Sequence, residues 1–265
     1  MSIPADGYPL AAAVTPRLHV VEMVDSTNAK LVRDATDDPD GHPHLSAVLT
    51  RDQRAGRGRL DRSWTAPPGT AIAVSVLLDV AAIADADRGW IPLLAGAAMQ
   101  RAVAAQLTDL DVSLKWPNDI VRGGGKAGGI LCEARARGPL TRLVVGCGLN
   151  LLPPPDAEAV VVAQPVAGLF EEGGVPDVLQ LARRLGEAIL AATDRLLADG
   201  LAPFLSQWQE HDLLRDRPIV IHHHDGERQA IARGVDVDGA LLVEPSDRPG
   251  TRERLLAEEV SVRPL

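Results

Sequence analysis

The sequence has few cysteines and no long apolar run. Its two cysteines, Cys132 and Cys147, each lie within a short apolar stretch of the 265 residues. Such a setting is typical of buried free thiols in a reducing compartment. No apolar run approaches the ~20 residues that a membrane-spanning helix needs. Residues 1–16 lack the basic start and apolar core of a signal peptide. These absences predict a cytoplasmic protein without a membrane partner.

An excess of positive charge is also missing. The chain has 27 lysines and arginines against 36 aspartates and glutamates, which gives a formal net charge of −9. Its pI is about 5.2. Such a chain lacks the broad basic surface with which proteins bind DNA or RNA. With 46% hydrophobic and 24% charged residues, it has the composition of a globular protein with one sizeable core and room for a small second domain.

Residues 51–64 stand out against this acidic background, because they contain five arginines and two glycines. The guanidinium group is a planar, permanently charged donor that suits phosphate and carboxylate oxygens. Glycines between arginines let the backbone approach an anion closely. The segment therefore predicts a loop that binds a small anionic substrate. Its spacing fits neither a P-loop nor a Rossmann fingerprint. Taken alone, the segment is also compatible with an ordinary surface loop.

Short apolar strands alternate with a few helices over most of the chain. The strands are rich in Val, Ile and Leu and bounded by Gly, Pro or Asp, the segment 177–198 keeps one apolar helix face, and 90–107 is apolar and rich in alanine, as in a buried helix. Strands are predicted at 44–50, 70–80, 112–116, 129–135 and 142–151; helices at 26–33, 90–107, 177–198 and near 204–211; and a loop at 152–176.

The last fifty residues have a different pattern, with four short strands predicted at 218–224, 229–235, 240–244 and 259–263. Asp225-Gly226 and Asp238-Gly239 are hairpin signals between them. The sequence thus predicts an α+β fold, in which a mixed or antiparallel sheet is flanked by helices and followed by a small β-barrel. We expect the catalytic domain to span residues 1–214 and the barrel to span residues 215–265.

Three further segments place polar residues at strand ends, where sites are often built. Residues 115–119 read Lys-Trp-Pro-Asn-Asp, Lys126 follows three glycines, and residues 146–150 read Gly-Cys-Gly-Leu-Asn. A lysine that leads into a buried strand can present its ammonium at a pocket floor, and small residues let a ligand lie close to the backbone. The alternatives are a charged strand end for Lys115 and a solvated turn for Lys126.

The run His222-His223-His224 suggests a metal site at first sight. However, alternate residues of a strand point to opposite faces, and neither cysteines nor acidic residues flank the run at ligand spacing. We therefore expect a solvated strand there.

Five motifs occur in a specific order along the chain. They are Asp25-Ser26-Thr27-Asn28, Gln53-x-x-Gly56-Arg57-Gly58-Arg59-x-x-Arg62-x-Trp64, Lys115-Trp116-Pro117-Asn118-Asp119, Lys126-x-x-Gly129-Ile130-Leu131-x-Glu133 and Gly146-x-Gly148-Leu149-Asn150. In this order they resemble the motifs of the biotin protein ligases. The resemblance runs from about Val20 to the C-terminus. It implies a class II synthetase-like core and a C-terminal SH3-like β-barrel.

The resemblance also implies a two-step reaction with biotin and ATP as substrates and Mg²⁺ accompanying the ATP. Biotinoyl-5′-AMP forms first, and a lysine of a biotin carboxyl carrier domain of an acyl-CoA carboxylase then takes the biotin. Arg59 and Lys126 are the implied catalytic residues. The implied biotin-binding residues are Ser26, Thr27, Asn28, Gln53, Gly56, Arg57, Gly58, Arg59, Trp64, Lys126 and Gly129. The implied ATP- and adenylate-binding residues are Arg57, Arg59, Arg62, Lys115, Asn118, Lys126 and Asn150, and Asp119 is the implied metal ligand.

The chain departs from the family pattern at two places. Asp61 stands where the family loop usually has glycine, and residues 168–173 lack the tryptophan that some members stack on adenine. Leu169 or Phe170 is a candidate substitute. Since only 25 residues precede Ser26, we expect the form without an N-terminal DNA-binding domain, and hence no DNA partner.

Two alternatives to the ligase are a lipoate or octanoyl ligase-transferase of the same superfamily and a biotin sensor without turnover. The sequence leaves open whether the protein is a monomer or a homodimer.

Overall fold

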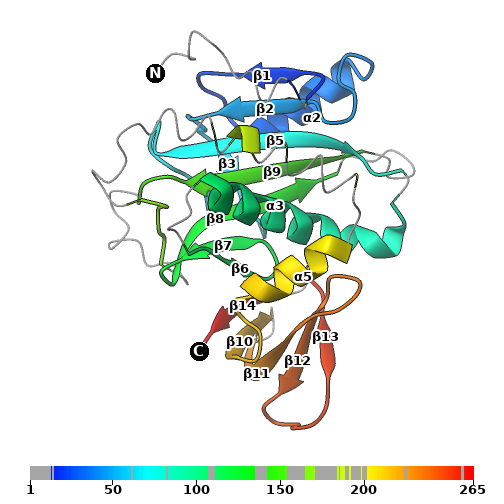
Figure 1. The fold of residues 1–265 in the computed structure, drawn as a ribbon, viewed down its shortest axis with the longest axis vertical. Helices are drawn as coiled ribbons and strands as arrows, with labels where there is room; N and C mark the ends of the chain where they lie inside the picture. Colours follow the sequence, from blue (N-terminus) through cyan, green and yellow to red (C-terminus); the bar gives the residue numbers. More distant parts are fainter. Residues whose placement is uncertain are drawn as a thin grey trace.

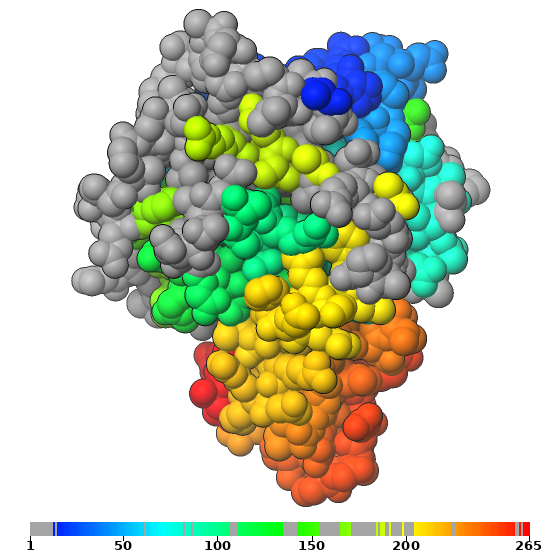
Figure 2. Space-filling view, in the orientation of Figure 1, coloured from blue at the N-terminus to red at the C-terminus, as the bar shows by residue number. Residues whose placement is uncertain are grey.

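The computed structural model describes residues 13, 15–60, 62–81, 83–106, 111–134, 142–153, 165–170, 184, 186–188, 191, 198, 202–223, 226–257 and 260–265. These residues form a large sheet with helices on its faces and a smaller sheet built from the last part of the chain (Figure 1). In the space-filling view the smaller sheet forms a separate lobe at one end of the molecule (Figure 2). No helix among the described residues is long and apolar enough to cross a membrane.

The large sheet has seven strands. In spatial order they are β1 (Leu18–Val20), β2 (Ala47–Thr50), β5 (Ala71–Asp79), β9 (Arg142–Asn150), β8 (Gly125–Glu133), β7 (Asp119–Arg122) and β6 (Ser113–Lys115). β1 runs parallel to β2, and every other neighbouring pair is antiparallel. The sheet is therefore mixed, which is one of the two arrangements expected from the sequence.

Both faces of this sheet are covered, which explains why β2 and β5 read as nearly continuous apolar runs. Leu31 of helix α2 (Thr27–Asp37) packs with Val48, Leu77 and Val144 on one face. Helix α3 (Ile91–Gln106) lies over the central strands (Figure 1). Its residues belong to the main core together with those of α5 (Ala202–His211). A short 3₁₀ helix, η1 (Asp85–Trp90), leads into α3.

The smaller sheet has five antiparallel strands in the order β13 (Glu253–Leu255), β12 (Leu241–Pro245), β11 (Gly226–Val235), β10 (Pro218–His223) and β14 (Ser261–Pro264). The predicted turn at Asp238-Gly239 is present, with a φ of 89° at the glycine, whereas Asp225 of the other turn lies outside the described residues. The indole nitrogen of Trp116 donates to the Gly239 carbonyl at 2.9 Å, and that of Trp90 donates to the Val237 carbonyl. These bonds join the two sheets.

Several elements differ from the sequence-based expectation. The strand predicted at 129–135 begins earlier, at Gly125, so Lys126 lies within β8 and not in a solvated turn. Strands β1, β7 and β13 and the two-residue pair β3 (Gly56–Arg57) and β4 (Ser63–Trp64) were not predicted. They are too short to carry a periodic pattern. Of the helix predicted at 177–198, residues 184, 186–188, 191 and 198 are described, and they are helical. The other residues of that prediction lie outside the described residues. The same holds for Arg135 and for most of the predicted loop 152–176.

Candidate functional site

A pocket of about 580 Å³ opens where the ends of β8 and β9, the segment 53–65 and the smaller sheet meet. Every residue expected to be catalytic, to bind biotin or ATP, or to hold the metal lines this pocket except Gly56: Ser26, Thr27, Asn28, Gln53, Arg57, Gly58, Arg59, Arg62, Trp64, Lys115, Asn118, Asp119, Lys126, Gly129 and Asn150. Motifs that are up to 124 residues apart in sequence, from Ser26 to Asn150, therefore converge on one cavity.

Asp119 holds two lysines at the floor of the pocket. Its Oδ1 lies 2.5 Å from Nζ of Lys126, and its Oδ2 lies 3.2 Å from Nζ of Lys115. Burial disfavours the ionised carboxylate, but the attraction of Lys126 and Lys115 outweighs burial and lowers the pKa of Asp119. Burial lowers the pKa of Lys115 despite the opposing effect of Asp119. The Lys126 side chain is 34% exposed against 7% for Lys115, so Lys126 is the ammonium that a ligand can reach.

The geometry does not fit the expectation that Asp119 binds a metal ion. Each of its oxygens already contacts an ammonium. A divalent cation at this carboxylate would lie within a few ångströms of two like charges. Among the described residues, Asp119 belongs to no group of three or more His, Cys, Asp or Glu side chains that could hold a metal ion.

Segment 53–65 forms a small hairpin over the pocket. Gly56 pairs with Trp64, and Arg57 pairs with Ser63. A Cβ atom at Gly56 would lie 2.4 Å from the Trp64 carbonyl oxygen, so only glycine fits there. A Cβ at Gly148 would lie 3.0 Å from the Trp64 ring. The indole therefore lies directly over the bare backbone of β9 and forms an apolar wall. Gly56 does not line the pocket itself but leaves room for the backbone of Trp64. Asp61 lies outside the described residues.

The arginines of the hairpin reach different partners. Arg57 forms an ion pair with Glu133, with Nη2 at 2.8 Å from Oε1. Arg59 donates from Nη1 to Oδ1 of Asn118 at 3.3 Å. It also donates from Nη2 to the carbonyls of Ala257 and Val260, which lie between β13 and β14 in the chain. Arg59 thus bridges the two sheets across the pocket mouth, while Arg57 ties the hairpin to the end of β8.

The start of α2 supplies the opposite end of the pocket. Ser26 caps the helix by accepting from the Ala29 amide. The amide and hydroxyl of Thr27 both donate to Oε1 of Gln53, at 2.8 and 3.0 Å. Nδ2 of Asn28 donates to the Leu131 carbonyl and to Oε2 of Glu133, and its Oδ1 accepts from Ser75 at 2.6 Å. Both amide hydrogens of Asn28 are therefore used within the protein, so Asn28 positions its neighbours.

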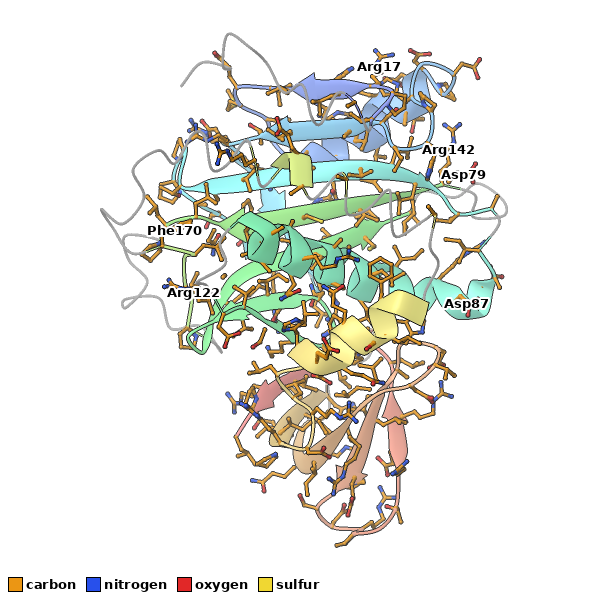
Figure 3. All side chains as sticks on the ribbon, in the orientation of Figure 1. Arg17, Asp79, Asp87, Arg122, Arg142 and Phe170 are labelled. Carbon is orange, nitrogen blue, oxygen red and sulfur yellow. The ribbon has the colours of Figure 1, made fainter. Side chains whose placement is uncertain are left out.

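Two further amides stand on the other side of the pocket. Nδ2 of Asn118 donates to the Ile130 carbonyl at 2.7 Å, and Nδ2 of Asn150 donates to the Ala167 carbonyl at 3.2 Å. Leu169 is fully buried in the main core, and Phe170 is packed against that core. Neither side chain lines the pocket. Figure 3 labels Phe170 and Arg122 on the same side of the molecule, where Arg122 donates to the Gly168 carbonyl at 3.1 Å.

The sequence did not predict that the smaller sheet would contribute to the pocket. His222, Val262 and Arg263 line it, as does Val166 from the segment before Leu169. His222 therefore departs from the expected solvated strand. Its Nδ1 lies 2.7 Å from Oε1 of Glu227, and its Nε2 is buried without a hydrogen-bond partner among the described residues. No local pattern marks these residues, because their role comes from how the two sheets pack.

The arrangement suits an elongated ligand with an anionic part. One end offers hydroxyl and amide groups, the middle has the Trp64 ring over the glycines of β8 and β9, and the other end has guanidinium and ammonium groups. Such a charge distribution in a partly enclosed pocket stabilises negative charge that builds up during phosphoryl or acyl transfer.

Comparisons with known proteins identify similar chains. A model of the biotin/lipoate A/B protein ligase family matches residues 20–150. The biotin–[acetyl-CoA-carboxylase] ligase of Paracoccus denitrificans is 34% identical over 246 residues, which cover 89% of this chain and 96% of that protein. The bifunctional ligase/repressor BirA of Salmonella typhimurium is 30% identical over 276 residues, which cover 99% of this chain and 83% of that protein.

A solved structure of the biotin protein ligase from Aquifex aeolicus in complex with biotin and ATP has the same fold. The two structures superpose with a TM-score of 0.72 at 21% sequence identity. The match covers 94% of this chain and 100% of the Aquifex aeolicus chain.

Proposed function

Since the chain belongs to the biotin protein ligase family, we propose that its pocket binds biotin and ATP, joins them as biotinoyl-5′-AMP and passes the biotin to a lysine of a carrier protein. The observation that carries this proposal is the placement of Arg59 and Lys126 on the same pocket from two sides. Arg59 contacts Asn118, and Lys126 contacts Asp119, the next residue. A sensor that only bound biotin could use Lys126 for the biotin carboxylate, but it would not need Arg59 and Arg62 in the same pocket.

In the first step a carboxylate oxygen of biotin forms a bond to the α-phosphorus of ATP. The bond from that phosphorus to the bridging oxygen breaks, and pyrophosphate leaves. Negative charge is spread over the phosphoryl oxygens and the leaving group, so fixed cations nearby lower the barrier. Lys126 holds the biotin carboxylate against the phosphorus, and Arg59 and Arg62 balance the charge of the phosphates.

In the second step the neutral amine of the acceptor lysine attacks the acyl carbon. An amide bond forms, AMP leaves with the bonding electron pair, and a proton passes to solvent. The adenylate must survive until that amine arrives. The hairpin of residues 56–64 lies over the pocket and excludes water from the intermediate.

We assign the ring system of biotin to the end of the pocket near α2. Ser26, Thr27 and Gln53 supply hydrogen-bonding groups there, and Arg57 and Gly58 close over it. Trp64 and Gly129 wall the apolar chain of biotin. Because the Arg57 side chain is paired with Glu133, Arg57 acts mainly on this half of the site, and the phosphates fall to the other two arginines.

Lys115, Asn118 and Asn150 serve the nucleotide half of the site. Lys115 acts through Asp119, which it helps to keep ionised and in place for Lys126. Mg²⁺ enters with ATP as its phosphate complex and needs no carboxylate of this chain in the proposal. Residues 1–214 form the catalytic domain, and residues 215–265 form the barrel-like domain that closes the nucleotide end with His222 and Arg263.

The acceptor is a biotin carboxyl carrier domain of an acyl-CoA carboxylase, as the name of the Paracoccus denitrificans relative suggests. The test is to incubate the full chain with biotin, MgATP and an acceptor domain that bears its target lysine in a Met-Lys-Met hairpin, and to measure the intact mass of the acceptor. We expect one biotinoyl group per acceptor domain, and none when that lysine is replaced by arginine.

Two parallel reactions separate the alternatives. Modification with lipoate in place of biotin would identify a lipoate ligase. Biotin binding without biotin-dependent release of pyrophosphate from ATP would identify a sensor and contradict the proposed activity.

A further inference from the structure

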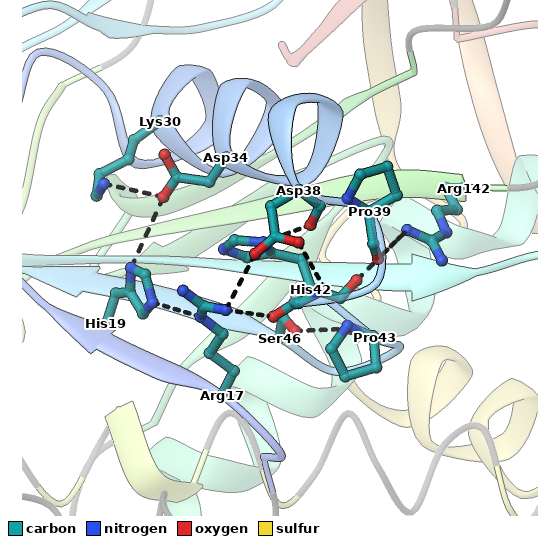
Figure 4. Close-up of polar contacts among 11 residues, drawn as sticks. Arg17, His19, Lys30, Asp34, Asp38, Pro39, His42, Pro43, Ser46 and Arg142 are labelled. Carbon is teal, nitrogen blue, oxygen red and sulfur yellow. Dashed lines mark hydrogen bonds and ion pairs between the residues drawn. The ribbon is translucent and has the colours of Figure 1, made fainter.

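A second cluster of chemically active side chains lies outside the pocket, between β1, α2 and the segment that connects α2 to β2 (Figure 4). His19 lies on β1, Asp34 on α2 and His42 on the connecting segment. One nitrogen of each histidine and one carboxylate oxygen of Asp34 all lie within 4.8 Å of one another. Three separate elements thus bring two imidazoles and a carboxylate together.

His42 is the most informative member of this cluster, because it is only 4% exposed. Its Nδ1 lies 2.9 Å from the backbone carbonyl oxygen of Asp38. A carbonyl can only accept, so Nδ1 carries the proton and Nε2 has a free lone pair. Nε2 is buried and has no hydrogen-bond partner among the described residues. A histidine that donates from one nitrogen to a carbonyl and leaves the other bare has the usual arrangement of a metal ligand.

His19 and Asp34 provide the other two donors. Nδ1 of His19 lies 3.7 Å from Oδ2 of Asp34, and its ring meets that of His42 edge-on, with centroids 5.6 Å apart. Both rings therefore face the same small space as the Asp34 carboxylate.

We propose that His19, Asp34 and His42 form a binding site for a divalent transition-metal ion of the Zn²⁺ type. Two imidazole nitrogens and one carboxylate oxygen are a donor set that suits Zn²⁺ and leaves one coordination position for water. Mg²⁺ and Ca²⁺ prefer sites made of oxygen donors. The inference does not depend on the proposed ligase activity.

Two cations now hold the ligands in place and compete with the metal. Nε of Arg17 lies 2.8 Å from Nε2 of His19, and Nζ of Lys30 lies 2.9 Å from Oδ2 of Asp34. The Arg17 side chain is 38% exposed, so it can turn toward solvent if it gives up its 2.6 Å hydrogen bond to the Gly41 carbonyl and its 3.6 Å contact with Asp38. Because Arg17 always donates its proton, removing its side chain frees a lone pair of His19. The variant Arg17→Met should therefore bind the metal more tightly than the unmodified chain.

A metal bound here would stabilise the folded state, because the three ligands come together only in that state. Asp34 lies on the same helix that begins beside the pocket with Thr27 and Asn28. The ion would fix this helix against β1 without touching the reacting groups.

The experiment is equilibrium dialysis of the metal-free full chain against Zn²⁺ without nucleotide or Mg²⁺, with the bound zinc measured per chain. Co²⁺ serves as a second probe, since a histidine-ligated Co²⁺ ion absorbs visible light. We expect one Zn²⁺ per chain, a visible Co²⁺ band, and a higher unfolding temperature with Zn²⁺. We expect affinity to fall at least tenfold in His42→Gln and in Asp34→Asn, and to rise in Arg17→Met.

The control variant is His223→Gln, which removes a histidine from the run at 222–224 and leaves His19, Asp34 and His42 unchanged. Circular dichroism checks that each variant folds, and Asp34→Asn keeps the test usable if His42→Gln does not. The proposal is overturned if the folded chain binds no zinc, if His42→Gln and Asp34→Asn retain full affinity, or if His223→Gln removes the bound zinc.

Discussion

Replacement of Lys126 by methionine separates the catalytic role of this residue from its contribution to stability. Methionine keeps the length and apolar stem of the side chain but removes the ammonium. In the folded protein the loss leaves Asp119 with one partner, because Nζ of Lys115 stays 3.2 Å from Oδ2. The carboxylate is therefore not left buried and unpaired, which is the situation that costs most.

The two expected effects differ in size. A partly exposed ion pair contributes about 0.2–1 kcal/mol, and the Lys126 side chain is 34% exposed. The free energy of unfolding should thus fall by about 1 kcal/mol or less. If Lys126 positions the biotin carboxylate and stabilises charge at the phosphorus, the loss of one such donor slows the step by roughly a hundredfold to a thousandfold. That loss corresponds to about 3–4 kcal/mol in the barrier.

The assay measures biotin-dependent exchange of pyrophosphate into ATP, alongside thermal unfolding of the same preparation. The matched control is Lys30→Met, because Lys30 also pairs with an aspartate, Asp34, at 2.9 Å but lies outside the pocket. The control should lose a similar amount of stability and keep its exchange rate. Equal exchange rates in the two variants would refute the role given to Lys126.

Three further substitutions test other parts of the structure. Arg59→Ala removes the bridge from the hairpin to Asn118 and the smaller sheet, so the adenylate should escape and label lysines of a bystander protein; labelling confined to the acceptor would contradict this. Gly146→Ala places a Cβ 2.1 Å from Oδ1 of Asn28, so stability should fall by about 1–3 kcal/mol and the KM for biotin should rise; a variant with unchanged unfolding and KM would count against it. Burial raises the pKa of Asp212 from 3.8 to about 6, so its contribution to stability is present below pH ~4 and is lost as the pH rises through 6. A shift of about two pKa units corresponds to at most about 3 kcal/mol. Asp212→Asn should therefore raise the free energy of unfolding by up to that amount at pH 8 and hardly at all at pH 4, as measured by urea unfolding at the two pH values.

Much of the fold is visible in the sequence because its main strands are long and apolar. β5 and β9 each have nine residues and pair along their whole length, and their Val, Ile and Leu runs predict them within one or two residues. The start of α2 is predicted by three candidate caps, Asp25, Ser26 and Thr27, of which Ser26 is the cap in the structure. The turn at Asp238-Gly239 predicts its hairpin because glycine accepts the left-handed conformation.

The parts that the sequence did not predict depend on contacts between distant residues. Asn28 reaches the Leu131 carbonyl and Glu133 across more than a hundred residues. The carbonyls that hold Arg59 come from residues 257 and 260. The cluster of His19, Asp34 and His42 has no regular spacing, since it forms only when β1 pairs with β2. Local patterns report which segments form helices and strands, and such sites depend on how those elements pack.

The whole chain contains three lysines, Lys30, Lys115 and Lys126, and each ammonium lies against an aspartate. A mixed anhydride acylates whichever free amine it meets, including those of the protein that made it. Scarcity of lysine, together with a carboxylate beside each one, leaves the anhydride few amines of this protein to acylate. Arginine, which such an anhydride does not readily acylate, supplies 24 of its 27 basic side chains. A chain so poor in ammonium groups should therefore acylate itself slowly while it turns over.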